Sequence, residues 1–223
     1  MNLEPDFIKD AEGAIFDLDG VIVDTAKYHY VAWKRLADEL RFEFTEAHNE
    51  RLKGVSRVRS LEILLEIGGF DFGETLKQQM LTLKNGWYLE YIHQMTGEEI
   101  LPGTRQYIEM LKSRGVRIAL GSASKNAQTI LNRLGIEDLF DVVIDGTSVS
   151  EAKPSPEVFI RGAEGLKLSP ERCVVFEDAS SGVEAAHRAQ MRAIGIGSKE
   201  NLPDADCNVS GLYELLSGSP TIN

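Results

Sequence analysis

Residues 14–23 read AIFDLDGVIV, a short apolar run that leads into two aspartates and a glycine. Residues two apart on an extended chain point to the same side, so Asp17 and Asp19 would project together from the end of a strand. In open α/β sheets this end of the strands is where ligands bind. The alternative is a β-hairpin, because Asp-Gly between AIF and VIV is also a strong turn signal. The stretch therefore predicts either a ligand-binding strand end or a hairpin.

Further short apolar runs follow along the chain, each bounded by turn residues. They lie at 116–120, 142–144, 173–176 and 193–196. Runs this short and apolar are typical of strands that are buried on both faces. Helices are predicted between them at about 103–114, 125–134, 156–166 and 180–190, with Ser155 as an N-cap and Pro156 in the first turn of the third. Alternating strands and helices predict a parallel sheet with helices on both faces.

The segment from Thr25 to about Gln94 does not follow this alternation. Apolar residues recur at helical spacing, as in Trp33 and Ala37, and no strand-like run interrupts them. A helical stretch this long is more than a single crossover connection needs. The sequence therefore predicts an inserted helical domain. The two predicted domains are an α/β domain of residues 1–24 and 96–223, and a helical domain of residues 25–95.

The composition is that of an ordinary soluble globular protein. The chain has 223 residues, 43% of them hydrophobic, with 24 Lys and Arg against 35 Asp and Glu, a net charge of −11. Such an acidic chain is a poor candidate for binding nucleic acid, which depends on cations at phosphates. No apolar run approaches the roughly 20 residues that span a bilayer, and MNLEPDFIKD at the start lacks the pattern of a secretory signal. Two cysteines without a CxxC pair indicate neither a zinc site nor a disulfide framework. A cytoplasmic enzyme or a soluble binding protein is expected.

A second pair of acidic residues follows another predicted strand. Residues 174–178 read VVFED, which places Glu177 and Asp178 at the end of an apolar run. By itself this is also what a solvated acidic loop looks like. If both acidic pairs lie side by side, however, their carboxylates repel one another unless a cation lies between them. Carboxylate and carbonyl oxygens favour Mg²⁺, which keeps coordination positions open for a phosphate.

Two other loops could bind the phosphate itself. Ser122 follows the predicted strand 116–120, where its hydroxyl and nearby N–H groups could hold phosphate oxygens at the start of a helix. The alternative is an ordinary helix-capping loop. Lys153 follows the third predicted strand, and Pro154 favours an extended conformation for it. A lone lysine is usually a solvated charge, but facing an acidic cluster it could neutralise a phosphoryl group.

These motifs, in this order, resemble the haloacid dehalogenase-like superfamily of aspartyl phosphotransferases over nearly the whole chain. The resemblance implies a Rossmann-like parallel-sheet core with an inserted all-helical cap domain. It implies that Asp17 is a nucleophile that accepts a phosphoryl group and that Asp19 is a general acid and base. Ser122 and Lys153 would stabilise the charge on the transferring phosphoryl. The implied Mg²⁺ ligands are the Asp17 side chain, the Asp19 backbone carbonyl, Glu177 and Asp178.

Longer stretches at 16–40, 51–57, 118–126 and 151–159 resemble the β-phosphoglucomutase family within that superfamily. There a cap loop, which corresponds here to Lys53, Gly54, Val55, Ser56 and Arg57, enters the active site. Arg57 would clamp the distal phosphate with its bidentate guanidinium; a basic surface loop is the alternative. His29 would couple cap closure to proton transfer, unless it is a structural histidine. The remaining implied substrate-binding residues are Trp33, Lys84, Ser122, Ala123, Ser124, Lys125 and Asn126, and Ser60 also aligns.

The resemblance implies a monomeric, Mg²⁺-dependent enzyme that converts β-D-glucose 1-phosphate to β-D-glucose 6-phosphate, with β-D-glucose 1,6-bisphosphate as activator and intermediate. A phosphatase of the same superfamily would share the acidic residues, and the KGVSR and SASKN segments favour the mutase over it. A non-catalytic protein on the same fold would be expected to have lost one of the acidic residues or Lys153. Two positions depart from the family pattern: Ala179, where serine is common, and Val23 in place of a hinge threonine.

Overall fold

Parallel strands in the order β3-β2-β1-β4-β5-β6 form one sheet in the computed structural model, which describes residues 5–52 and 56–216. The strands are β1 (Gly13–Phe16), β2 (Arg117–Gly121), β3 (Val142–Ile144), β4 (Cys173–Glu177), β5 (Arg192–Ile196) and β6 (Cys207–Val209). The first five confirm the predicted strands, whereas β6 was not predicted. β1 pairs in parallel on both sides, with Phe16 beside Leu120 and Phe176. The hairpin interpretation of residues 14–23 is therefore wrong.

Helices cover the sheet on both faces. They are α6 (Thr104–Ser113), α7 (Ala127–Leu134), α8 (Glu157–Leu166) and α9 (Ser180–Arg188), and the short helix α1 (Asp6–Lys9) precedes β1. The four longer helices confirm the predicted ones. Helix α8 begins one residue later than predicted, with Pro156 as the N-cap, while the Ser155 hydroxyl accepts a 3.5 Å hydrogen bond from the Glu157 N–H. Short 3₁₀ helices complete the fold: η1 (Gly97–Glu99), η2 (Glu137–Leu139), η3 (Pro170–Arg172) and η4 (Leu212–Leu216).

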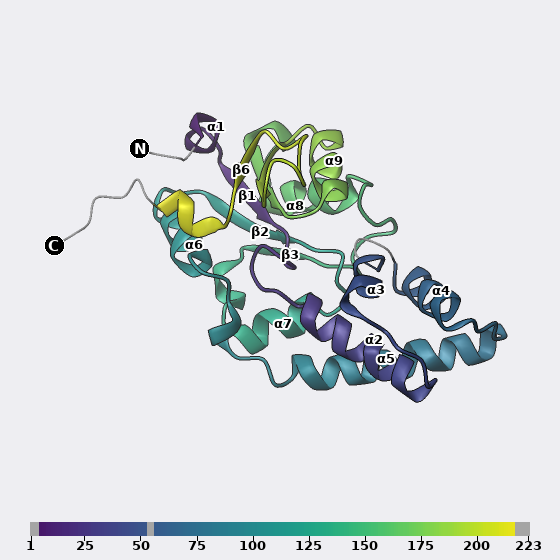
Figure 1. The fold of residues 1–223 in the computed structure, drawn as a ribbon. Coiled ribbons are helices and arrows are strands. Elements are labelled where there is room, and N and C mark those ends of the chain that lie inside the picture. The colour runs from purple at the N-terminus through teal and green to yellow at the C-terminus, as the bar shows by residue number, and fades with distance from the viewer. Residues whose placement is uncertain (1–4, 53–55, 217–223) are drawn as a thin grey trace. The chain divides into compact units, whose positions relative to one another are not determined.

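The two faces of the sheet carry separate parts of the core because side chains alternate along each strand. Ile15 and Val175 belong to a cluster with Phe159 of α8 and Val183 of α9. One residue further along each strand, the rings of Phe16 and Phe176 stack at 4.4 Å on the opposite face. Figure 1 shows α8 and α9 on one side of the strands and α6 and α7 on the other. Burial on both faces therefore fixes β1 and β4 firmly beneath the acidic residues that follow them.

The chain divides into two compact units, residues 1–24 with 96–223 and residues 25–95. The second unit, called here the helical unit, consists of α2 (Ala26–Glu39), α3 (Glu46–Glu50), α4 (Arg57–Gly68) and α5 (Glu74–Ile92). Apolar side chains of α2, α4 and α5, among them Trp33, Leu64 and Trp87, are buried between these helices. Gly69 adopts φ of +72° at the end of α4, a conformation that favours glycine. Within the described part of the chain, no helix has the length and apolar character needed to cross a bilayer.

Candidate active site

A cluster of carboxylates lies where β1 and β4 end side by side. Because Phe16 pairs with Phe176, the next residues, Asp17 and Glu177, lie together at the same edge of the sheet. The Asp17 N–H also donates a 2.9 Å hydrogen bond to the carbonyl of Phe176. Oxygens of Asp17, Glu177 and Asp178 lie within 4.8 Å of one another, a spacing that could hold a metal ion. β1 has β2 on one side and β4 on the other, so the cluster lies at the point where the strand order reverses, the usual ligand position in such sheets.

Lys153 reaches this cluster from the loop between β3 and α8. Its Nζ lies 2.5 Å from Asp17 Oδ1 and 2.8 Å from Glu177 Oε1. All three side chains are at most 9% exposed. The solvated interpretation of this lysine is therefore wrong, and so is the solvated interpretation of Glu177. Asp178 lies at the solvent side of the cluster.

Burial and crowding control the charges in this cluster. Burial raises the pKa of Asp17 to about 7, and the charges of Glu177 and Asp19 act in the same direction while Lys153 opposes them. Desolvation, Glu177 and Asp17 raise the pKa of Asp178 to about 8. Burial alone would lower the pKa of Lys153, but Asp17 and Glu177 outweigh it and raise that pKa. The negative charges of the ionised carboxylates therefore outnumber the positive charge of Lys153. A further cation would stabilise the ionised forms.

Two glycines make room for the carboxylates. A Cβ on Gly182, in the first turn of α9, would lie 1.6 Å from Glu177 Oε1, and one on Gly20 would lie 2.0 Å from Asp178 Oδ2. Glu177 therefore folds back against the start of α9, where its Oε2 accepts a 2.9 Å hydrogen bond from the Ala179 N–H. Gly182 was not among the predicted site residues. A glycine inside a predicted helix was the signal available, since such a residue usually has a packing reason.

The loop after β2 is held by its own hydroxyls. Ser122 is buried, its N–H donates to the Ile144 carbonyl at 2.9 Å, and its Oγ accepts from the Ser124 N–H at 3.0 Å. The Ser124 Oγ accepts in turn from the Asn126 N–H at 3.2 Å, just before α7. Gly146 closes on this loop so tightly that a Cβ there would lie 2.2 Å from the Ala123 carbonyl. Ala123 and Lys125 are exposed, so the loop presents an open rim beyond a buried serine.

The helical unit buries a group of basic residues between α2 and α5. Lys84 is 1% exposed, and its Nζ lies 2.8 Å from His29 Nδ1 and 4.5 Å from the centre of the Trp33 ring. Burial and, to a smaller extent, the charge of Arg57 together lower the pKa of Lys84 to about 7. Burial also lowers the pKa of His29, with Lys84 and Arg57 acting in the same direction. His29 is therefore neutral near pH 7 and accepts a hydrogen bond from Lys84 at Nδ1.

The predicted cap-loop residues are only partly described. Lys53, Gly54 and Val55 lie outside the described residues. Ser56 is the N-cap of α4, where its hydroxyl accepts a 3.2 Å hydrogen bond from the Arg59 N–H. Arg57 follows as the first residue of that helix and is exposed, and Ser60 is buried one turn further.

Comparison with known proteins decides the family. A family model described as haloacid dehalogenase-like hydrolase matches residues 11–190. The chain belongs to the haloacid dehalogenase-like family. The matched range includes both acidic strand ends, Ser122, Lys153 and the whole helical unit.

Individual relatives of this family are similar over most of their length. The chain is 41% identical to the β-phosphoglucomutase of Bacillus subtilis (strain 168) over 206 residues, 92% of this chain and 91% of the relative. It is 34% identical to a phosphorylated carbohydrates phosphatase of Thermotoga maritima, covering 82% of this chain and 83% of the relative. Among solved structures, the β-phosphoglucomutase of Clostridium difficile matches with a TM-score of 0.84 and 43% identity, covering 92% of this chain and 93% of that one.

The predicted site residues fall into two sets in this haloacid dehalogenase-like protein. The α/β unit contains Asp17, Asp19, Ser122, Ala123, Ser124, Lys125, Asn126, Lys153, Glu177 and Asp178. The helical unit contains His29, Trp33, Ser56, Arg57 and Lys84. The structure brings Asp17, Lys153, Glu177 and Asp178 into one cluster and brings His29, Trp33 and Lys84 into another. The roles predicted for these residues remain predictions.

Proposed function

We propose that this protein interconverts β-D-glucose 1-phosphate and β-D-glucose 6-phosphate through a phosphorylated Asp17. The observation that carries the proposal is the 41% identity to a β-phosphoglucomutase over 92% of the chain, a range that spans both units. The carboxylate cluster beside Lys153 supplies the groups that this chemistry needs.

Asp17 is the proposed nucleophile. Its carboxylate attacks phosphorus, an Asp17–phosphorus bond forms, and the bond to the sugar oxygen breaks. The ion pair with Lys153 at 2.5 Å favours the ionised carboxylate that this attack requires. Asp19 gives a proton to the leaving oxygen and later takes one from the hydroxyl that attacks the phosphoaspartate. Lys153 and Ser122 hold the oxygens of the phosphoryl group, where negative charge collects during transfer.

Mg²⁺ fits this site. Three carboxylates lie within 4.8 Å of one another, and the pKa of Asp17 is raised to about 7 and that of Asp178 to about 8 by crowding and burial that a divalent cation would offset. We assign the ion to the side chains of Asp17, Glu177 and Asp178 with the backbone carbonyl of Asp19. When bound, Mg²⁺ would supply charge neutralisation and polarisation of a phosphoryl oxygen.

A mutase also needs a second phosphate site, because its bisphosphate intermediate carries two phosphates. We assign the distal phosphate to Arg57 of the helical unit, with Lys84 of the same unit as a further cation. The loop from Ser124 to Asn126 stays a predicted substrate-binding segment of the α/β unit. Burial lowers the pKa of Lys84 to about 7, so a bound phosphate would restore its full positive charge. His29 holds the lysine at 2.8 Å. β-D-glucose 1,6-bisphosphate is the proposed activator, since it leaves Asp17 phosphorylated.

A sugar-phosphate phosphatase is the second candidate. The phosphorylated carbohydrates phosphatase of T. maritima, 34% identical over 82% of this chain, favours it. Water would then replace the sugar hydroxyl as acceptor, while Asp17, Asp19 and the metal ligands would keep their roles.

A product balance tests the proposal. The protein is incubated with Mg²⁺, β-glucose 1-phosphate and a trace of β-glucose 1,6-bisphosphate, and glucose 6-phosphate and free phosphate are followed together. We expect glucose 6-phosphate far in excess of free phosphate, with a rate that falls sharply when the bisphosphate is omitted. Free phosphate with little glucose 6-phosphate would establish the phosphatase instead. Neither product would mean that the protein is not a catalyst for these substrates.

A further inference from the structure

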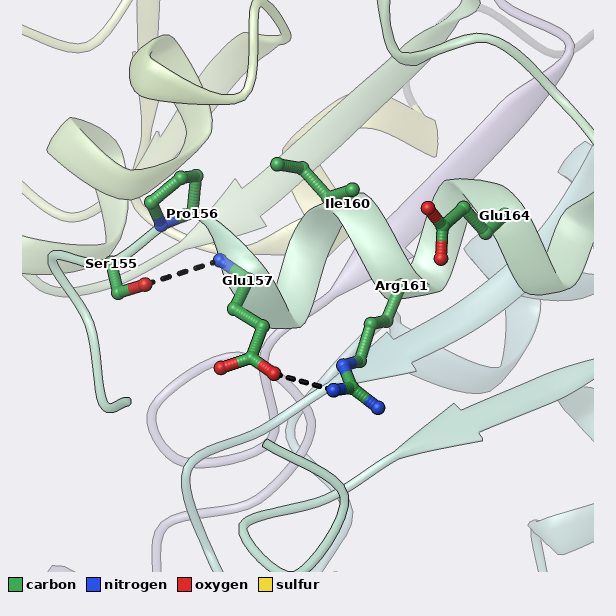
Figure 2. A pocket seen from close by; sticks show the side chains of 6 residues that line it. All are labelled: Ser155, Pro156, Glu157, Ile160, Arg161 and Glu164. Carbon is green, nitrogen blue, oxygen red and sulfur yellow. Dashed lines mark hydrogen bonds and ion pairs between the residues drawn. The ribbon is translucent and has the colours of Figure 1, made fainter. Parts of the chain in front are cut away.

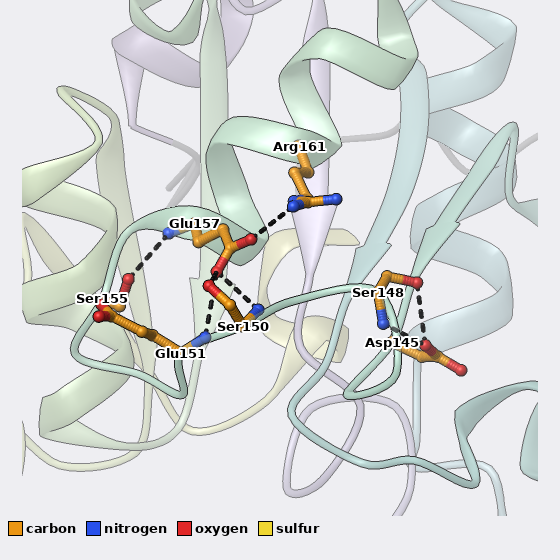
Figure 3. A network of polar contacts seen from close by, with 7 residues as sticks. All are labelled: Asp145, Ser148, Ser150, Glu151, Ser155, Glu157 and Arg161. Atoms are coloured by element: carbon orange, nitrogen blue, oxygen red, sulfur yellow. Dashed lines mark hydrogen bonds and ion pairs between the residues drawn. The ribbon is translucent and has the colours of Figure 1, made fainter.

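The loop between β3 and α8 carries Lys153 but has no regular secondary structure from Asp145 to Pro156. Two carboxylates give it its shape. At its start, Asp145 Oδ1 accepts hydrogen bonds from the Thr147 N–H at 2.9 Å and the Ser148 hydroxyl at 3.0 Å. At its end, Glu157 binds a stretch of the loop that lies closer to Lys153. Figure 3 shows these two carboxylates at opposite ends of the loop.

Glu157 is the carboxylate that binds the part of the loop nearer to Lys153 in sequence. Its Oε2 accepts from the N–H and the hydroxyl of Ser150, both at 2.8 Å, and from the Glu151 N–H at 3.1 Å. Its Oε1 lies 2.6 Å from the Arg161 guanidinium. The Ser150 hydroxyl and the Glu151 N–H lower the pKa of Glu157 to about 2, so the side chain is a carboxylate at any physiological pH. Hydrogen bonds to a charged acceptor of this kind are the stronger ones.

The element that carries Glu157 is fixed in the core. Glu157 is the first residue of α8, and the next two residues, Val158 and Phe159, are buried at 2% and 0% exposure against the sheet. Phe159 also lies beneath Lys153, whose Nζ is 4.8 Å from the centre of its ring. Figure 2 shows the Ser155 hydroxyl directed to the Glu157 N–H and Arg161 directed to the Glu157 carboxylate. Glu157 thus links the loop to a helix whose next residues are packed in the core.

We propose that Glu157 is a positioning residue for Lys153. By holding Ser150 and Glu151 from the start of α8, it fixes one end of the short span that contains Lys153, while Ser155 fixes the other. The loop conformation that results keeps the Lys153 ammonium beside Asp17 and Glu177. This inference rests on the proposed function, because it gives Glu157 a kinetic effect only if Lys153 assists phosphoryl transfer.

An ordinary surface role for Glu157 predicts something different. Glu157 and Arg161 are four residues apart on one helix, and ion pairs at this spacing contribute little to stability. If that were the whole role, removal of the carboxylate would change the rate of phosphoryl transfer very little. Any loss would also be the same whether or not Lys153 is present. A double-mutant cycle separates the two roles.

The cycle uses Glu157→Ala, Lys153→Met and the double variant of the full chain, assayed for turnover of β-glucose 1-phosphate with Mg²⁺. Because small displacements of a catalytic group can cost up to about a hundredfold, we expect Glu157→Ala to lower kcat on the order of tenfold, with a smaller change in KM. In the Lys153→Met background the same substitution should change kcat less than about twofold. Equal losses in both backgrounds, or no loss in the natural one, would overturn the inference.

Two controls keep the result interpretable. Glu164→Ala removes an exposed carboxylate from the same helix and should leave kcat unchanged. Glu157→Gln keeps one acceptor oxygen for Ser150 and should lose less than Glu157→Ala; if the alanine variant does not fold, the cycle is run with glutamine. A natural protein that forms neither product would overturn the proposed function and this inference together, whereas an active protein without coupling overturns the inference alone.

Amide hydrogen exchange supplies a readout that is independent of turnover. The N–H groups of Ser150 and Glu151 donate to Glu157, so both should exchange faster in Glu157→Ala than in the natural protein. Amides in the middle of α8 should be unaffected. Unchanged exchange at Ser150 and Glu151 would show that the carboxylate does not hold the loop.

Discussion

The two units of this protein each bury a lysine, and the two lysines respond to burial in opposite ways. In the α/β unit, Lys153 lies within 2.8 Å of two carboxylates, which raise its pKa. In the helical unit, Lys84 contacts the neutral ring nitrogen of His29, and burial and Arg57 lower its pKa to about 7. The same residue type is therefore permanently charged in one unit and only partly charged near neutral pH in the other.

The opposite pKa shifts of Lys153 and Lys84 favour different roles for the two lysines in the proposed function. Lys153 already has its counter-charges and can neutralise an incoming phosphoryl without any change in its own protonation. Lys84 is only partly charged near neutral pH, and a bound anion would favour its protonated form. In the proposed function, the α/β unit thus supplies the groups for phosphoryl transfer, and the helical unit supplies a basic group for an anionic ligand.

Removal of the Asp17 carboxylate is expected to have the largest effect. Asp17→Asn keeps the shape of the side chain but cannot form a phosphoaspartate, so we expect turnover and phosphoenzyme both to fall below detection. Intact-protein mass spectrometry after incubation with the bisphosphate measures the phosphoenzyme directly. Substantial turnover by Asp17→Asn would rule out the covalent mechanism. It would also contradict the proposal that the α/β unit supplies the groups for phosphoryl transfer.

Substitution of Gly182 tests whether the position of the Glu177 carboxylate matters for metal binding. Gly182→Ala places a Cβ where Glu177 Oε1 now lies, so we expect Mg²⁺ affinity to fall by about 10–100-fold, the usual cost of disturbing support around a metal ligand. The matched control is Gly86→Ala in α5, where a Cβ meets nothing within 4 Å and alanine favours a helix. Calorimetric titration with Mg²⁺ measures both variants. Equal affinities would mean that Glu177 can move without loss and does not bind the ion where we place it.

The parts of the fold and site that depend on local sequence pattern could be predicted. The apolar composition of buried runs of four or five residues, such as β1 and β4, predicts strands. The acidic residues that end or follow these runs, Asp17 and Glu177, are then predicted at strand ends. β6 was not predicted because its three residues read CNV, with the polar Asn208 in the middle, and so form no apolar run; the equally short β3 reads VVI. Pairing with β5 makes these residues a strand. No periodicity distinguishes such an edge strand from a loop.

Tertiary contacts account for what was missed at the site. Gly182 matters only because Glu177 folds back onto it, and Glu157 matters only because its carboxylate reaches Ser150 seven residues earlier. In α5, Leu76 and Leu83 are exposed at 39% and 48% while Lys84 is buried. The contacts that bury a lysine there come from His29 and Trp33 on α2, which local pattern does not reveal.

Arg57→Ala tests the assignment of the distal phosphate to the helical unit. A mutase substrate has a phosphate that does not react, whereas a small donor such as acetyl phosphate has only the transferring one. We expect Arg57→Ala to lower kcat/KM for β-glucose 1-phosphate by at least about tenfold, the value of a charge-assisted bidentate contact, and to leave phosphorylation of Asp17 by acetyl phosphate nearly unchanged. Arg59→Ala, which removes a neighbouring arginine paired with Glu62 and Glu66, is the control. Equal losses with both donors would contradict a distal-phosphate role.

The acidic cluster should make the α/β unit less stable as pH rises when divalent metal is removed. Asp17 and Asp178 have a pKa of about 7 and about 8 in the folded protein, against an ordinary value of 3.8. Between pH 4 and 8 the folded state therefore holds protons that the unfolded state has released, and its free energy of unfolding falls with pH. Amide exchange of β4 in EDTA measures this trend. Mg²⁺ should flatten it, because metal binding favours the deprotonated ligands; the same slope with and without Mg²⁺ would contradict the metal assignment.

The basic site of the helical unit should produce the opposite slope in a higher pH range, with the smallest effect of the set. Lys84 has a pKa of about 7 when folded and an ordinary value of 10.5, so between these values the unfolded state binds the extra proton and stability rises with pH. Lys84→Met removes that contribution. Both tryptophans of the chain, Trp33 and Trp87, lie in this unit, so their fluorescence reports its unfolding by urea separately from the α/β unit. We expect the free energy of unfolding of the natural protein to rise from pH 7 to 10 relative to Lys84→Met. If the free energies of unfolding of both proteins change with pH in parallel, Lys84 keeps its proton despite burial. The two lysines would then differ in their partners but not in their protonation.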